Sequence, residues 1–164
     1  MATPVVFDVN VLVRAVTAGQ TQFRCWPSPP PTSTNPSADC VGIINDTAEF
    51  ALWLSPHILE NTSRVLTDAY KMDSGVVEEY IDMLAGIATA SGGGAIDPPQ
   101  RVDDCADWED NRILDLALET GAFMIVSGDA DLTTMSPWQG RPIIEPRQFT
   151  SLVDASRRAR KRRR

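Results

Sequence analysis

Short apolar runs alternate with segments of helical periodicity in the first half of the chain. Residues 4–7 (PVVF) and 50–54 (FALWL) are apolar runs of strand length. In residues 9–18, from His57 to about Tyr70, and from about Gly75 to Ala90, apolar residues recur every three or four positions, which is typical of a helix with one buried face. This half of the sequence therefore predicts two strands and three helices.

The same alternation continues in the second half. The pattern predicts a helix from about Asp107, a strand at 123–126 (FMIV), a short helix after Asp129, a strand at 142–144 (PII) and a final helix near Gln148. Repeated alternation of strands and helices is typical of a parallel sheet with helices on both faces. The expected fold class is therefore α/β.

Two stretches interrupt this pattern. Residues 17–40 are rich in Pro, Ser and Thr, so neither a helix nor a strand is expected to persist there, and an inserted surface loop is predicted at about 19–40. Residues 91–99 (SGGGAIDPP) form a second break, which lacks the Lys-Ser or Lys-Thr ending of a phosphate-binding loop. The length of 164 residues suits one domain, expected at 1–156.

Charge is distributed unevenly between the body of the chain and its C-terminus. Seven of the fifteen Lys and Arg residues lie in 157–164 (RRARKRRR), which leaves eight against twenty-two Asp and Glu in residues 1–156. The net charge of −7 thus combines about −14 in the body with +7 in the tail. Self-repulsion predicts a disordered tail, which is either a solubilising terminus or a segment that contacts a phosphate backbone or an acidic partner.

Composition argues against several classes of protein. No apolar run approaches the roughly 20 residues of a membrane-spanning helix, and no signal-peptide pattern is present, so we expect a cytoplasmic protein without a membrane segment. The three widely spaced cysteines predict neither a disulfide framework nor a thiolate zinc site. His57 is the only histidine, and Lys71 and Lys161 are the only lysines, so paired-histidine and phosphate-cradling mechanisms are poorly supported. Carboxylates remain as the candidate reactive groups.

Several carboxylates stand where the expected fold would direct them to one place. Asp8 and Asp129 follow strands, and in a parallel sheet both lie at the carboxyl edge, where open α/β sheets bind ligands. Asp110 falls within the apolar stripe of its helix and is expected to face the protein. Each has a structural alternative: Asp8 and Asp129 as helix N-caps, and Asp110 in a capping box with Asp107. Asp131 is either a further member of the cluster or a solvated acid in the first turn of a helix.

Mutual repulsion decides what such a cluster requires. Two carboxylates ~4 Å apart repel by about 4 kcal/mol at an effective dielectric constant near 20, and three or four together exceed what a marginally stable domain tolerates. The group must be protonated or share a cation. Hard oxygen ligands without His or Cys favour Mg²⁺ or Mn²⁺ over zinc. The hypothesis is a divalent-ion site formed by Asp8, Asp110, Asp129 and Asp131.

Three acidic motifs of the sequence resemble those of a known family. VVFDVNVLV near the start, DWEDNRILDLALETGA in the last third and IVSGDADL after it look like the motifs of the PIN-domain nucleases. SPHILENTSRVL and PWQGRPIIEPRQF resemble the VapC-like toxin branch, so the likeness covers most of residues 4–153. The resemblance implies a three-layer α/β/α sandwich with a central, mostly parallel sheet. It also implies a Mg²⁺- or Mn²⁺-dependent ribonuclease that acts as the toxin of a type II toxin–antitoxin pair.

The resemblance also assigns roles to individual residues. By position, Asp8, Asp110 and Asp129 match the catalytic and metal-binding acids of the family, and Asp131 matches a fourth metal ligand. The residues expected to support them with polar contacts are Asn10, Asn61, Asn111 and Ser127.

One position departs from the family pattern. The catalytic Glu that is usual in the helix after the second strand falls at Asn61, whereas Glu60 stands one residue earlier, which rotates its side chain by about 100° around the helix. Either Glu60 or Asn61 is expected to contribute to catalysis. The family further implies an RNA substrate, a cognate antitoxin protein and a homodimer. The alternative is a noncatalytic PIN-like module that binds a protein or RNA.

Overall fold

A five-stranded sheet organises the part of the chain that the structure describes, residues 1–18 and 34–164. Its strands are β1 (Thr3–Phe7), β2 (Phe50–Leu54), β3 (Gly94–Ala95), β4 (Met124–Val126) and β5 (Ile143–Ile144). In this computed structural model the strands follow the order β3-β2-β1-β4-β5, and every neighbouring pair is parallel. The central strand β1 is therefore flanked by β2 and β4.

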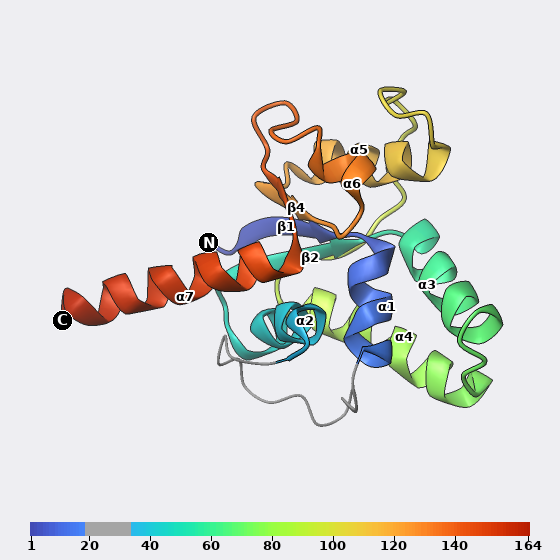
Figure 1. The fold of residues 1–164 in the computed structure, drawn as a ribbon, viewed down its shortest axis with the longest axis horizontal. Coiled ribbons are helices and arrows are strands. Elements are labelled where there is room, and N and C mark those ends of the chain that lie inside the picture. The colour runs from blue at the N-terminus through green and yellow to red at the C-terminus, as the bar shows by residue number, and fades with distance from the viewer. Residues whose placement is uncertain (19–33) are drawn as a thin grey trace.

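Helices cover both faces of the sheet. They are α1 (Val9–Thr17), α2 (Pro36–Asp46), α3 (Pro56–Asp68), α4 (Ser74–Ala90), α5 (Trp108–Thr120), α6 (Ala130–Thr133) and α7 (Pro146–Arg162). α5 and α6 lie on one face, α1 to α4 lie on the other, and α7 packs against α2 (Figure 1). The expected three-layer α/β/α sandwich is confirmed. Among the helices described, none is long and apolar enough to cross a membrane.

The elements expected from periodicity are all present, with ends shifted by one or two residues. In β1, Val5, Val6 and Phe7 are fully buried because helices cover both faces of this strand. The Phe149 ring of α7 packs edge-on against Phe7 and Phe50, with ring centroids 5.6 Å and 5.1 Å apart. Burial on both faces explains why the strands are unbroken apolar runs.

Parallel pairing aligns the carboxyl ends of β1 and β4. Phe7 pairs with Val126, and the Asp8 N–H donates to the Val126 carbonyl oxygen at 2.9 Å. The residues that follow the two strands, Asp8 and Ser127, are therefore side by side. Asp8 and Asp129 also cap α1 and α6. For these two aspartates, both alternatives apply: each caps a helix and each lies at the carboxyl edge of the sheet.

Helix α2 corrects the expected extent of the inserted loop. The sequence predicts a loop at about 19–40, yet α2 begins at Pro36, and residues 19–33 lie outside the described residues. Proline is favourable at the first helical position because the N–H that it lacks would have no partner there. The Asn35 side chain caps the helix by accepting from the Ala38 N–H at 3.1 Å. Asn35 and Pro36, residue types that often interrupt secondary structure, therefore start a helix here.

The C-terminal segment 157–164 is helical through Arg162, so the prediction of a disordered tail is wrong for most of it. Arg, Lys and Ala are strong helix formers, and cations are favourable at a helix C-terminus. Arg158 pairs with Asp154 one turn earlier at 2.7 Å, and two further arginines contact Glu49. These contacts offset the self-repulsion. Figure 1 shows α7 extending away from the sheet, with the C-terminus at its far end.

The glycine run that reads as a second break contains the edge strand β3. A Cβ atom at Gly93 would lie 1.9 Å from the Leu52 carbonyl oxygen of β2. Only glycine permits this close approach, so the run allows the chain to pair with β2.

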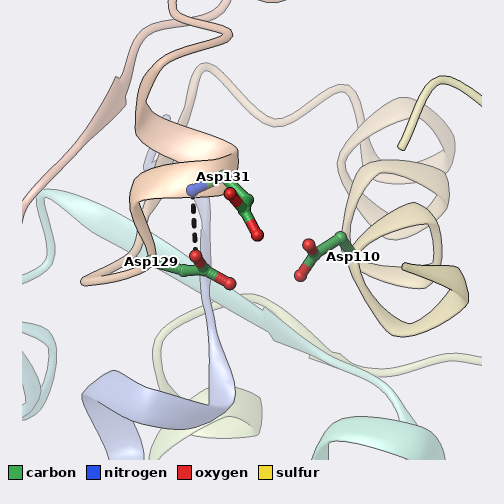
Figure 2. A group of neighbouring side chains, drawn as sticks. All are labelled: Asp110, Asp129 and Asp131. Carbon is green, nitrogen blue, oxygen red and sulfur yellow. Dashed lines mark hydrogen bonds between the residues drawn. The ribbon is translucent and has the colours of Figure 1, made fainter. Parts of the chain in front are cut away.

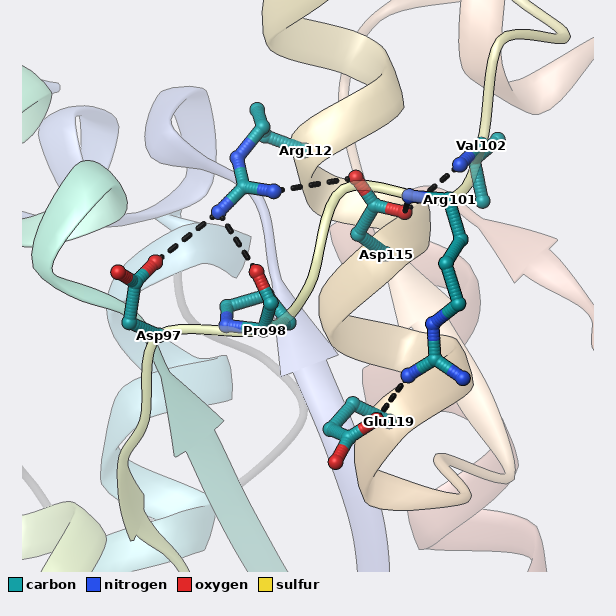
Figure 3. A network of polar contacts seen from close by, with 7 residues as sticks. All are labelled: Asp97, Pro98, Arg101, Val102, Arg112, Asp115 and Glu119. Atoms are coloured by element: carbon teal, nitrogen blue, oxygen red, sulfur yellow. Dashed lines mark hydrogen bonds and ion pairs between the residues drawn. The ribbon is translucent and has the colours of Figure 1, made fainter.

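A buried polar network attaches α5 to the segment that precedes it (Figure 3). The buried Arg112 guanidinium donates to Asp115 at 3.2 Å, and to Asp97 and the Pro98 carbonyl oxygen at 3.0 Å each. The other oxygen of Asp115, which is 1% exposed, accepts from the backbone N–H groups of residues 101–102 at 2.8 Å each. The network therefore fixes the position of α5 and of the side chains in its first turn.

Replacing Asp115 by asparagine tests this network. Asp115→Asn keeps the size of the side chain but removes the buried negative charge beside Arg112, so we expect a loss of about 3 kcal/mol in the free energy of unfolding. The measurement is urea denaturation. The control is Glu119→Gln at the exposed pair with Arg101, which should cost less than about 1 kcal/mol. Equal losses in the two variants would contradict the structural role of the network.

Candidate metal centre

Three carboxylates converge at the carboxyl edge of the sheet (Figure 2). Asp110 in α5, Asp129 after β4 and Asp131 in α6 each offer one oxygen, and these oxygens lie within 4.8 Å of one another. Asp110 is buried, Asp129 is half-buried and Asp131 is exposed, so the cluster opens to solvent on the side of α6. Two segments that are separate in the sequence thus supply one group of oxygen donors.

Local hydrogen bonds fix the two aspartates that follow β4. Asp129 Oδ1 accepts from the Asp131 N–H at 2.9 Å, while the other Asp129 oxygen points toward Asp110 (Figure 2). The Asp129 N–H donates to the buried Ser127 Oγ at 3.0 Å. Capping α6 therefore leaves one oxygen of Asp129 free for the cluster.

Asp8 lines the same pocket as Asp110 and Asp129. It is 7% exposed, and both of its oxygens are hydrogen-bonded: Oδ1 accepts from the Val9 N–H at 2.7 Å, and Oδ2 accepts from Ser127 Oγ at 2.7 Å. Asn10 Nδ2 also donates to Oδ2 at 3.1 Å, and Asn10 Oδ1 accepts from the Gly128 N–H at 2.9 Å. Asn10 and Ser127 thus both hydrogen-bond the same oxygen of Asp8.

The carboxylates of the pocket are short of compensating positive charge. Burial raises the pKa of Asp110 to about 6, and repulsion from Asp129 and Asp8 adds to the rise. Burial also raises the pKa of Asp8, although the hydrogen bond from Ser127 acts in the opposite direction. A cation among these groups would favour their ionised forms.

Asp8, Asp110 and Asp129 line an open pocket of about 330 Å³ whose other walls come from α1, α3 and α5. Arg14, His57 and Tyr70 line it, and none of them was expected at the site from the sequence. For Arg14 a signal exists, because it follows Asn10 by four positions and therefore lies on the same face of α1.

The structure separates the two candidates on α3. Asn61 is buried at the pocket, where its Nδ2 lies 2.9 Å from His57 Nε2 and its Oδ1 accepts from Arg64 at 2.7 Å. Glu60 is exposed and is not one of the residues that line the pocket. Of these two positions, the structure brings only Asn61 to the acids.

Asn111 and Asp107 hold the first turn of α5 in place. Asn111 accepts from the Cys105 N–H at 2.8 Å and donates to the Cys105 carbonyl oxygen at 3.0 Å, and it does not line the pocket. Asp107 caps α5 by accepting from the Glu109 N–H at 2.8 Å. Asp110 is then directed at the other acids (Figure 2). The support that Asn111 provides is therefore structural and indirect.

The donor set fits a hard divalent cation. Among the described residues, the groups gathered at the cluster are carboxylate oxygens, which such ions prefer as ligands. His57, also in the pocket, has its Nε2 engaged with Asn61. Asp110, Asp129 and Asp131 would hold the ion, and Asp8 would stabilise it from the adjoining wall.

The acids cluster at the carboxyl edge of a parallel sheet, which is where open α/β folds bind their ligands. Comparison with protein families matches residues 4–131 to the PIN domain. The match spans most of the chain, which therefore belongs to the PIN-domain family. PIN domains are generally nucleases, which are hydrolases that usually use a divalent metal. No curated protein matches the sequence.

Replacing Asp110 by asparagine tests the repulsion in the pocket. In the metal-free protein, the folded state keeps the Asp110 proton up to about pH 6, whereas the unfolded state releases it near 3.8, so stability falls as the pH rises through this window. The full shift represents roughly 3 kcal/mol, and water at the pocket mouth screens part of it. Asp110→Asn should therefore raise the free energy of unfolding at pH 7 by about 1 kcal/mol, measured by urea denaturation with EDTA.

The same variant should lose Mn²⁺ binding in titration calorimetry, because it removes one of the three clustered carboxylates. Wild-type affinity should fall below about pH 6, as protons compete for Asp110. The control is Asp103→Asn, an exposed acid before α5, which should change neither stability nor Mn²⁺ binding. Unchanged Mn²⁺ affinity in Asp110→Asn would remove Asp110 from the metal site.

Proposed function

We propose that the protein is a Mg²⁺- or Mn²⁺-dependent endoribonuclease that hydrolyses RNA phosphodiester bonds. The proposal is supported by the convergence of Asp110, Asp129 and Asp131 beside Asp8 in a chain of the PIN-domain family. A ligand set made of oxygens favours Mg²⁺ or Mn²⁺ over softer metals. When bound, such an ion orients and acidifies water and screens the charge of the scissile phosphate.

The residues of the pocket have separable roles in this proposal. The three clustered acids hold the ion, and Asp8 adds a fixed negative charge beside them. Ser127 and Asn10 keep Asp8 in one orientation through the hydrogen bonds to its Oδ2. The amide of Asn61 faces the pocket and is able to hydrogen-bond a water molecule or a phosphate oxygen. Because the metal-free pocket repels a phosphate, RNA entry depends on prior binding of the cation.

The proposal includes a biological setting. The protein acts in the cytoplasm as the toxin of a type II toxin–antitoxin pair, assembles as a homodimer and is neutralised by a cognate antitoxin protein. The support for this setting is the resemblance of SPHILENTSRVL and PWQGRPIIEPRQF to the toxin branch of the family. Growth arrest that is relieved by co-expressing a small protein encoded directly upstream is the observation that tests it.

A noncatalytic binding module is the alternative that one observation favours. The usual acid of the helix after the second strand is replaced by Asn61 at the pocket, and an amide does not accept a proton as a carboxylate does. Glu60, the neighbouring acid, is exposed and away from the pocket. On this alternative the protein binds a cation and RNA or a protein partner without cleavage. Metal-stimulated cleavage distinguishes the two.

The first test is cleavage of a mixed pool of single-stranded RNA by purified protein with and without Mn²⁺. Cleavage is expected only with Mn²⁺, and Asp129→Asn should lower its rate by about 100-fold or more, because the ion loses a ligand. Asp82→Asn, an exposed acid of α4, is the matched control and should retain full activity. A wild-type protein that binds Mn²⁺ but cuts no RNA in the pool would favour the noncatalytic module.

A second test separates the two positions of α3. Asn61→Ala removes a polar group that faces the pocket, so kcat should fall by roughly tenfold to a hundredfold. Glu60→Gln, the control next to it, should leave kcat unchanged, since its side chain is exposed outside the pocket. Thermal denaturation of both variants shows whether the folded state is retained. A loss of activity confined to Glu60→Gln would contradict the geometry described above.

A further inference from the structure

A second groove adjoins the metal pocket along α1. Asn10 and Arg14 line both hollows, so the two share a wall about 6 Å long, one turn of helix. From this wall the groove, about 340 Å³ in volume, continues past the first turns of α2 and α7. A chain-like ligand that leaves the metal pocket on this side enters the groove.

The two hollows carry opposite charge. Among the described residues, the charged side chains that line the groove are Arg14, Arg147 and Glu145. The positive ends of the α2 and α7 dipoles also face this region and add to the potential of the arginines. Apart from the shared Arg14, the charged residues that line the metal pocket are Asp8, Asp107, Glu109, Asp110 and Asp129.

Arg14 and Arg147 are available to a ligand. Both are exposed, and neither forms an ion pair with any of the described residues. Residues 1–156 carry about −14 of net charge. Among their described Lys and Arg residues, Lys71 and Arg141 also form no ion pair, but Arg14 and Arg147 are the two that line the groove. By contrast, the arginines of α3, of α5 and of the segment between α4 and α5 each pair with an acid: Arg64 with Glu109, Arg112 with Asp115, and Arg101 with Glu119.

We propose that Arg14 and Arg147 bind phosphates of single-stranded RNA on one side of the scissile bond, so that the groove sets the direction in which the strand crosses the metal pocket. The inference rests on the proposed ribonuclease function. A guanidinium group binds phosphate oxygens through paired, charge-assisted hydrogen bonds. Arg14 stands where the two hollows meet and Arg147 stands farther along the groove, so a strand meets them in succession.

The opposite flank of the metal pocket offers no such pair of cations. There, α3 and α5 present His57, Asn61 and Glu109 to the pocket. Arg64 of this flank is bonded to Asn61 and to Glu109. Within the described part of the chain, a strand that crosses the pocket therefore meets unpaired arginines on one side only.

The basic C-terminal end of α7 is too distant from the groove to bind the same phosphates. Arg147 lies in the first turn of α7, whereas Arg160 is about 20 Å farther along the helix axis. Figure 1 shows this end of α7 extended away from α1. The proposed phosphate contacts are therefore separate from any that the C-terminal arginines make.

The test uses a short single-stranded RNA that the wild-type protein cuts at one mapped position in Mn²⁺. The RNA is shortened one nucleotide at a time from its 5′ end or from its 3′ end. On one side only, shortening should raise KM by about tenfold in the wild type, with kcat little changed, because phosphate contacts are lost. In Arg14→Gln/Arg147→Gln, KM for the full-length RNA should already be raised by about tenfold, and shortening that side should have no further effect.

Arg101→Gln is the control, since it removes one arginine charge outside the groove, from the exposed pair with Glu119 (Figure 3). It should keep the wild-type KM and the wild-type response to shortening. The dependence of log KM on log salt should become shallower by about one for each arginine removed from the groove. A double variant that still responds to shortening on the same side, or an equal rise of KM in Arg101→Gln, would overturn the proposal.

Failure of the ribonuclease function is recognised separately. If the wild type cuts no RNA in Mn²⁺, fluorescence anisotropy with a labelled single-stranded RNA still measures the affinity of the protein for RNA. Affinity about tenfold lower in Arg14→Gln/Arg147→Gln than in Arg101→Gln supports phosphate binding by the two arginines. Equal affinities in the wild type and the double variant reject it, whether or not the protein cleaves RNA.

Discussion

The parallel pairing of β1 with β4 is the constraint on which the site depends. It brings the ends of both strands to one edge, so that Asp8 and Ser127 are neighbours and the turn that carries Asp129 follows directly. Carboxylates gathered at such an edge repel, by about 4 kcal/mol for a pair ~4 Å apart at an effective dielectric constant near 20. Hydrogen bonds from the backbone and from Ser127 offset part of this repulsion for Asp8, whereas the raised pKa of Asp110 reflects what remains. A bound cation would offset the remaining repulsion. The strand pairing that gathers the carboxylates is therefore also the reason why the site favours a metal ion.

A buried polar network keeps Asp110 where this repulsion acts. Helix α5 would relieve the repulsion by moving outward, yet Arg112 and Asp115 attach it to the segment between β3 and α5, and Asn111 attaches its first turn to Cys105. A buried ion pair adds little net stability compared with well-packed apolar residues, although breaking it costs several kcal/mol. Its contribution here is to position α5, because any shift of the helix would leave buried charges without partners. The stability of this network and the geometry of the metal centre are therefore linked through one helix.

Sequence patterns predict the features that depend on local periodicity. Asp8 and Asp129 each follow an apolar run, which predicts their position at the sheet edge, and Asp110 interrupts an apolar stripe, which predicts its burial. Sequence patterns gave the wrong local structure where a partner elsewhere in the chain stabilises a helix. Pro36 starts a helix rather than extending a loop because α2 packs against α1 and α7. The arginine-rich tail is helical because Glu49 and other acids lie within reach of its side chains. Sequence patterns could not decide between Glu60 and Asn61 on α3, since one position along a helix turns a side chain by about 100°. The structure was needed to show which of them reaches the pocket. The partners of Arg112 in the loop before α5 left no periodic signal at all.

The two arginines of the groove cannot substitute for the cation of the pocket. Five acids line the metal pocket, and each repels a phosphate ~6 Å away by roughly 3 kcal/mol at an effective dielectric constant near 20. Two guanidinium groups at similar distances offset only two such terms, so the metal-free pocket remains repulsive toward RNA. A divalent ion held by the clustered acids would add two positive charges to the pocket. At physiological salt the Debye length is about 8 Å, so each phosphate responds mainly to its nearest charges. In the proposed ribonuclease, the cation would therefore act on the scissile phosphate and the arginines on the phosphates beside it, from two hollows of opposite charge that share the wall formed by Asn10 and Arg14.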